Sequence, residues 1–109
     1  MISWNDFEKV DIRVGTIVEV NDFPKARKPA FKLLIDFGEL GMKRSSAQIT
    51  SFYTKETLLN RQVIAVVNFP PKQIADFISE CLVLGVYTAE KDVVLLQPEQ
   101  CVENGWKIG

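Results

Sequence analysis

A buried strand with a rigid exit is the feature that most constrains how this chain can fold. The segment Val63–Val67 is an unbroken, mostly β-branched apolar run, whereas a half-exposed strand would alternate polar and apolar residues. It therefore predicts a strand covered on both faces. Pro70 and Pro71 donate no hydrogen bond to a sheet, so the backbone must leave the sheet there. This places Asn68 and Lys72 at the rim of the domain, where binding groups often lie, although an ordinary polar exit explains them equally well.

The other apolar patterns predict further short strands and two short helices. Strands are expected at residues 11–20, 31–37, 42–50, 79–85 and 93–96, and helices after Ser3 and at residues 55–59. Gly15 shifts the alternation of the first strand and predicts a bulge or bend there. Residues 72–77 are expected to form an irregular or helical crossing. The pattern predicts an all-β fold over residues 1–109, a five-stranded Greek-key barrel of the oligonucleotide/oligosaccharide-binding (OB) type, with an α+β roll as the alternative.

Charge is distributed unevenly along the chain, although the net charge is only -1. Residues 23–73 carry nine bases and three acids, and both flanking segments are acidic. Such asymmetry points to an anionic partner. These bases could instead mix with acids once the chain folds, and sequence position does not separate the two arrangements. The predicted strand at residues 42–50 is poor in large apolar groups, so one of its faces is expected to meet solvent or a ligand.

Few residues suit catalysis or metal binding. The chain has no histidine, the most frequent general acid–base and metal ligand, and its six glycines form no phosphate-binding loop. We therefore expect no enzyme activity, no metal and no cofactor. Cys81 and Cys101 are expected to be free thiols in a reducing cytoplasm. The first residues lack the pattern of a signal peptide, and no apolar run is long enough for membrane insertion, so a cytoplasmic location is expected.

Four motifs, in order along the chain, resemble those of the free-standing tRNA-binding domain family. They are Asp11–Ile17, Arg44–Ile49, Asn68–Lys72 and Ser79–Gly85, with the sequences DIRVGTI, RSSAQI, NFPPK and SECLVLG. The branch that they resemble most is the CsaA type, known both as a secretion-related chaperone and as a tRNA-binding protein. RNA-binding members typically have an Ala-Asp-Lys-Leu segment after the first strand and Gly-Met in the last motif. This chain has neither segment, and both differences are of the kind found in the CsaA type.

The resemblance implies a five-stranded OB barrel that works as a homodimer, with both chain ends packed at the two-fold interface. The interface residues would be Trp4, Phe7, Trp106 and Ile108. The matching polar and basic residues that would bind RNA are Arg44, Ser46, Gln48, Asn68, Lys72 and Ser79. Lys32 and Lys43 join this set because they belong to the basic central segment.

Two functions are compatible with these observations. The first is non-catalytic binding of tRNA by a homodimer, with phosphate contacts that weaken with salt and recognition of RNA shape. Phe31, Phe52 and Tyr53 could stack on unpaired bases, although core positions would also explain them. The second is an export-related chaperone that binds unfolded precursor proteins through exposed apolar residues at the chain ends and near the prolines. Dimer contact and core account for those residues too, and the charge asymmetry leads us to favour RNA binding.

Overall fold

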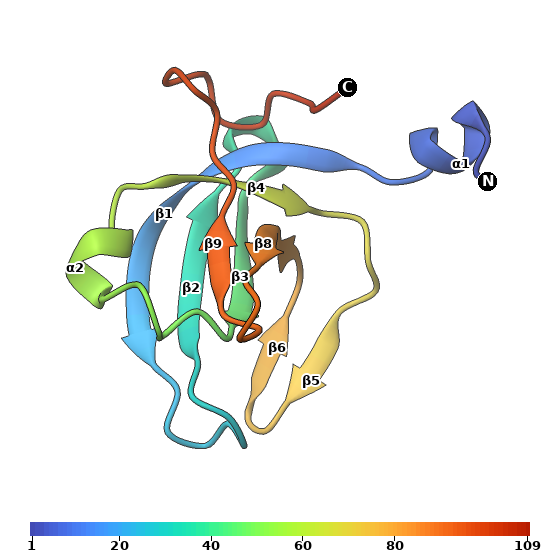
Figure 1. Cartoon of the computed structure of the whole chain (residues 1–109). Helices are drawn as coiled ribbons and strands as arrows, with labels where there is room; N and C mark the ends of the chain where they lie inside the picture. The colour runs from blue at the N-terminus through green and yellow to red at the C-terminus, as the bar shows by residue number, and fades with distance from the viewer.

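The chain forms a strongly curved five-stranded antiparallel sheet flanked by two small hairpins (Figure 1). A computed structural model describes all residues, 1–109. The main sheet has the order β3-β2-β1-β4-β7, made of β1 (Ile12–Asp22), β2 (Phe31–Asp36), β3 (Met42–Ala47), β4 (Gln62–Val66) and β7 (Leu82–Val83). The hairpins pair β5 (Lys72–Ile74) with β6 (Phe77–Ser79) and β8 (Gly85–Tyr87) with β9 (Val93–Leu95). The helical elements are α1 (Trp4–Glu8), α2 (Lys55–Leu58) and the 3-10 turn η1 (Gly38–Leu40).

The two ends of the strand order meet, so the sheet is nearly a closed barrel. The backbone N–H of Glu80, just before β7, donates to the carbonyl of Arg44 on β3 at 2.7 Å. The hydroxyl of Ser45 donates to the carbonyl of Cys81 at 3.0 Å across the same junction. These bonds satisfy backbone groups that an open sheet edge would expose. The predicted all-β OB-type barrel, with a helix between the third and fourth barrel strands, is confirmed.

Strand β1 is long because it serves two neighbours. Its first half pairs with β4 and its second half with β2. The register shift lies between Ile17 and Glu19, so the bulge predicted at Gly15 is misplaced by a few residues. Gly15 is required for close packing instead, because a Cβ there would come within 2.6 Å of Ile35 and 2.7 Å of the Phe37 ring.

The core confirms the doubly covered strand. All residues of Val63–Val67 are buried, and the fully buried Leu58 of α2 belongs to the same core cluster as Val63, Ala65 and Val67. Helix α2 begins at the N-cap Thr54, whose hydroxyl accepts from the Thr57 N–H. In return, the Thr57 hydroxyl accepts from the Thr54 N–H. No helix is both long enough and apolar enough to cross a bilayer.

Two segments differ from the sequence-based prediction. Residues 72–77, expected to be irregular or helical, instead form most of the β5–β6 hairpin, which turns at Ala75 in the left-handed region with φ of 52°. An alanine gives no turn signal of the kind that glycine or asparagine gives. The predicted strand at residues 79–85 is broken into pieces of β6, β7 and β8, because Glu80 and Cys81 turn aside to bond β3. Strand β3 ends at Ala47, three residues earlier than expected.

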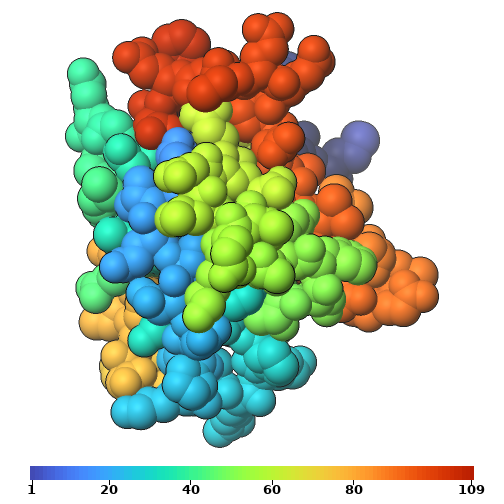
Figure 2. Space-filling model, turned by 90° about the vertical axis from the view of Figure 1, so that its left-hand side faces the viewer, coloured from blue at the N-terminus to red at the C-terminus, as the bar shows by residue number.

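The C-terminal tail, residues 102–108, lies along the part of β1 that β2 leaves free. Backbone bonds join Val14 N–H to the Trp106 carbonyl at 3.0 Å and Ile108 N–H to the Ile12 carbonyl at 2.8 Å. The Gln62 amide fixes the start of the tail by donating to the Val102 carbonyl at 2.7 Å. Figure 2 shows the tail across the top of the barrel, at the end opposite the β1–β2 loop.

Candidate nucleic-acid interface

Three predicted RNA-binding residues share the outer face of β2 and β3. Lys32 lies directly opposite Ser46 in the antiparallel register, and Leu34 lies opposite Arg44. Side chains alternate along a strand, and the neighbouring residues Leu33 and Ser45 are buried in the barrel. Lys32, Arg44 and Ser46 therefore point away from the core. This confirms that one face of β3 is left for solvent or a ligand.

Two aromatic rings hold the cations of this face in place. Phe23 of the β1–β2 loop and Phe77 of β6 pack edge to face with their centroids 5.5 Å apart. The Lys32 ammonium lies 5.5 Å from the Phe23 centroid and 5.9 Å from that of Phe77, and the Arg44 guanidinium lies 5.9 Å from Phe77. Cations at this range are attracted to the ring faces. The rings thus position the two positive charges at the surface. Because the rings are uncharged, they do not neutralise these charges.

An ion pair joins the β1–β2 loop to the tip of the β5–β6 hairpin. The Lys25 ammonium lies 3.1 Å from the Asp76 carboxylate, joining the β1–β2 loop to the turn of the β5–β6 hairpin. This hydrogen bond holds the pKa of Asp76 below its usual range. Both side chains are well exposed, so the pair contributes little to stability and chiefly marks the proximity of the two loops.

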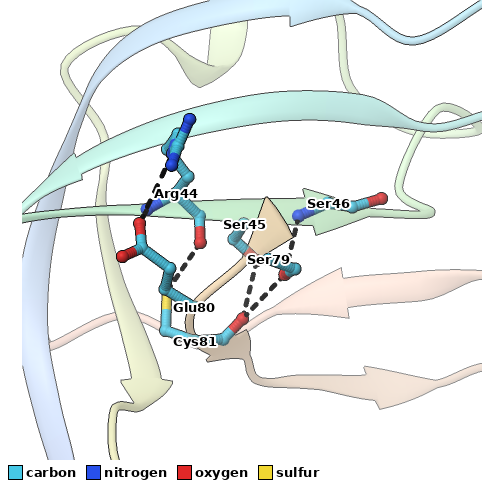
Figure 3. Close-up of polar contacts among 6 residues, drawn as sticks. All are labelled: Arg44, Ser45, Ser46, Ser79, Glu80 and Cys81. Atoms are coloured by element: carbon cyan, nitrogen blue, oxygen red, sulfur yellow. Dashed lines mark hydrogen bonds and ion pairs between the residues drawn. The ribbon is translucent and has the colours of Figure 1, made fainter. Parts of the chain in front are cut away.

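The junction between β3 and β6–β7 is a dense polar network (Figure 3). The Glu80 carboxylate accepts from the Arg44 backbone N–H at 3.0 Å and lies 3.5 Å from the Arg44 Nε. The Ser79 hydroxyl accepts from the Ser46 N–H at 3.1 Å and donates to the Cys81 carbonyl at 3.4 Å. Burial raises the pKa of Cys81 to about 11, so its thiol is neutral. The predicted site residue Ser79 is therefore engaged within the fold.

A groove of about 690 Å³ opens beside this network, between the end of β3, the β4–β5 loop and the β8–β9 hairpin. Four of the predicted residues line it, namely Ser46, Gln48, Lys72 and Ser79. Sequence reasoning missed Tyr87 and Lys91, which line the same groove from the β8–β9 hairpin. Neither residue lies in a recognisable motif, and only the folded position of the β8–β9 hairpin brings them to the groove.

The structure separates Lys43 and Asn68 from the other predicted residues. Lys43 lies opposite the fully buried Ile35, on the face of β3 that Arg44 and Ser46 do not share. The Asn68 amide donates to the Lys9 carbonyl at 2.7 Å and accepts from the Asp11 N–H at 2.9 Å. Both polar ends of this side chain fasten the segment that leads from α1 into β1.

The basic central segment is only partly neutralised by folding. Of its nine bases, three pair with acids of the flanking segments, in Lys25–Asp76, Arg44–Glu80 and Lys55–Asp22. Arg61 lies over the Tyr53 ring, at the side of the barrel that carries α2.

Phe31 is buried and the Tyr53 hydroxyl accepts from Leu95 N–H at 2.9 Å, so both belong to the fold, whereas Phe52 is exposed.

The predicted dimer residues lie at the two chain ends. Trp4 is 79% exposed and Trp106 is 56% exposed, while Phe7 and Ile108 are half-buried. The rings of Trp4 and Phe7 contact each other edge to face at 6.4 Å. Helix α1 has no buried residue and projects from the barrel in Figure 1. These apolar groups are therefore available to another surface.

Comparison with known proteins identifies the family. Residues 12–107 match the family model for "Putative tRNA binding domain". The chain belongs to the tRNA-binding domain family. It is also similar over its whole length to the CsaA chaperone of Picrophilus torridus, with 60% identity, a TM-score of 0.94 and complete coverage of both chains. The CsaA chaperone of Bacillus anthracis shares 54% identity with a TM-score of 0.95, over 100% of this chain and 99% of that one. The family and the CsaA branch that the motifs predict are thus confirmed.

The domain also occurs inside much longer relatives. The methionine–tRNA ligase of Pyrococcus abyssi is 36% identical over 107 residues, which is 98% of this chain and 14% of that enzyme. The methionine–tRNA ligase of Nanoarchaeum equitans is 34% identical over 110 residues, 99% of this chain and again 14% of the enzyme. The chain thus spans about a seventh of the length of these relatives.

Proposed function

We propose that this member of the tRNA-binding domain family binds folded tRNA, without catalysis, through the outer face of β2–β3 and the loops that border it. The supporting observation is the placement of Lys32 and Arg44 over the Phe23 and Phe77 rings, beside a groove that Lys72 lines. OB barrels bind oligonucleotides with this strand face, the loop between the first two strands and the loop between the last two. Here those loops are the β1–β2 loop and the segment that carries β5–β6.

The mechanism is electrostatic positioning. Lys32, Arg44 and Lys72 contact phosphates, and each such contact releases counterions from the nucleic acid. Hydrogen bonds from Ser46 and Gln48 add to these contacts. Contacts to the backbone fix the orientation of an RNA but carry no sequence information, so recognition depends mainly on the shape of the folded RNA.

The test is a titration with folded tRNA at several salt concentrations. Three phosphate contacts predict that the logarithm of the binding constant falls by roughly two to three for each tenfold rise in salt. A matched titration with double-stranded DNA shows whether the A-form shape matters. Binding that does not change with salt, or no binding, would rule out this function.

The protein works as a homodimer through its chain ends. A five-residue helix is far too short to be stable alone, and α1 buries nothing against its own barrel. A second copy that packs on Trp4 and Trp106 would stabilise it. Two copies would also present two β2–β3 faces to one folded RNA.

Binding of unfolded precursor proteins is the second candidate. The similarity to two CsaA chaperones favours it, as do the exposed apolar side chains of Phe69, Leu82 and Tyr87 at the groove. An assay of whether the protein keeps an unfolded precursor in solution tests this function directly. Persistence of that activity after loss of RNA binding would show two separate surfaces.

A further inference from the structure

We propose that the groove between β3, the β4–β5 loop and the β8–β9 hairpin receives an unpaired nucleotide of the bound RNA. This inference rests on the proposed RNA-binding function and adds to it a base-dependent subsite. With a volume of about 690 Å³, the groove falls within the range of about 300–1,000 Å³ that is usual for pockets of small organic ligands. It meets the Lys32–Arg44 face at Ser46, which lines the groove and lies opposite Lys32.

Two exposed aromatic rings border the groove from different elements. Tyr87 of β8 is 73% exposed and Phe69 of the β4–β5 loop is 54% exposed. Neither ring packs on another aromatic ring or carries a cation, in contrast to Phe23 and Phe77. Their faces are free to stack on a nucleobase, whereas the rings of the β2–β3 face are already occupied by Lys32 and Arg44.

The groove also carries unneutralised positive charge. Lys72 and Lys91 are exposed at its border, and neither has a carboxylate within ion-pair distance. The one acidic lining residue, Glu80, is engaged by Arg44. Lys91 is in the left-handed region with φ of 68°, a costly conformation for a lysine that often marks functional positions. These features suit the phosphates that flank a nucleotide.

Free hydrogen-bonding groups are available for the base edge. The Gln48 amide and the Ser46 hydroxyl make no hydrogen bond within the chain, although their neighbour Ser79 makes two. An amide offers both donors and an acceptor, which matches the mixed edge of an unpaired base. An extended peptide would instead pair with a strand edge. That edge is closed here, because the N–H groups of Arg44 and Ser46 are bound to Glu80 and Ser79.

The experiment measures binding of two RNA hairpins by fluorescence anisotropy. Both have the same stem and the same loop phosphates, but one has loop bases and the other has abasic loop sites. The wild-type protein is expected to bind the base-bearing hairpin about 5- to 150-fold more tightly, the range given by stacking one base on an aromatic ring.

Variants assign that difference to the groove. The double variant Tyr87→Ala with Phe69→Ala is expected to remove it while affinity for the abasic hairpin stays unchanged, and Tyr87→Phe is expected to keep it. Leu59→Ala removes an exposed apolar side chain outside the groove and should also keep it. Circular dichroism and thermal unfolding verify that each variant folds.

Three results would overturn the inference. Equal binding of both hairpins by the wild-type protein would show that bases are not read. Retention of the base-dependent difference in the double variant would place the subsite elsewhere. A third result combines equal binding of both hairpins with competition by a carboxymethylated unfolded polypeptide. If Tyr87→Ala abolishes that competition, the groove binds polypeptides instead. Failure to bind either hairpin would reject the proposed RNA function itself.

Discussion

Phe23 and Phe77 lie edge to face with their ring centroids 5.5 Å apart, and the Lys32 ammonium is within 6 Å of both centroids. This contact joins the β1–β2 loop to the β5–β6 hairpin over the outer face of β2–β3. It thereby holds two segments that are distant in sequence next to each other. The position of Lys32, a proposed phosphate contact, depends on an aromatic contact, so changes to the rings should alter RNA affinity without removing any charge.

Removal of Arg44 and Lys72 tests the phosphate contacts. The double variant Arg44→Ala with Lys72→Ala is expected to weaken tRNA binding and to reduce the salt slope by about two, or about one for each lost contact. The measurement is a titration at several salt concentrations. Lys55→Ala is a matched control for Arg44→Ala, since Lys55 is also exposed and ion-paired but lies on α2. Unchanged affinity in the double variant would refute the assignment.

Phe77→Leu tests the role of the ring in positioning. It keeps every charge but removes the cation–π contacts of Lys32 and Arg44, each worth about 0.5–1 kcal/mol at exposed sites. We expect tRNA affinity to fall several-fold with an unchanged salt slope, because the phosphate contacts persist in a less ordered form. Leu59→Ala is the control, since the exposed Leu59 has no proposed contact with RNA and lies at the end of α2. An unaltered Kd in Phe77→Leu would mean that the rings do not position the cations.

Trp4→Ala tests the proposed dimer. Trp4 is 79% exposed in the single chain, so its truncation should cost the isolated barrel little stability. We expect it to shift the protein toward monomer in light scattering coupled to size-exclusion chromatography. Its tRNA affinity should fall as well if two faces act on one RNA. A wild-type protein that is monomeric at all concentrations would contradict the proposal directly.

Asn68→Ala tests whether Asn68 serves the fold. Its amide holds the Lys9 carbonyl and the Asp11 N–H, so the variant should lose hydrogen-exchange protection at Asp11 and about 1 kcal/mol of stability. Because this side chain is engaged away from the groove, the salt slope of RNA binding should be unchanged. A reduced slope with normal protection at Asp11 would instead place Asn68 among the RNA contacts.

The Cys81 thiol predicts a loss of stability at alkaline pH. Folding raises its pKa from 9.0 to about 11 through burial. Between these values the unfolded thiol loses its proton while the native thiol keeps it, so the free energy of unfolding falls as pH rises from 9 to 11. The full effect is about 2–3 kcal/mol. Urea unfolding at several pH values should show this component in Cys101→Ala, where the exposed thiol is removed, but not in Cys81→Ala.

Elements with a strong local signal were predictable from the sequence. The doubly buried strand at Val63–Val67, the helix that begins after Ser3 and the polar face of β3 all follow from residue pattern. The motifs in their order were sufficient to indicate the family. The β5–β6 hairpin was missed because its turn uses Ala75 at positive φ, and no local pattern announces such a turn.

The candidate site was less accessible because it is assembled by long-range contacts. Asn68 looks like a rim residue in sequence, and only the path of the α1–β1 segment reveals that its amide is occupied. Strand alternation places Lys43 and Arg44 on opposite faces of β3. It does not say which of the two faces is buried, and only the structure shows that. Tyr87 and Lys91 enter the groove only through the packing of the β8–β9 hairpin, which no short sequence window contains.

The tail along β1 also limits how this protein can associate. Residues 105–108 occupy the N–H and carbonyl groups of Val14 and the carbonyl of Ile12, which would otherwise form a template for another chain. A neighbouring molecule therefore cannot add a strand at this edge. A protease that trimmed the chain before residue 105 would uncover that template and open this edge to strand addition by a neighbouring molecule.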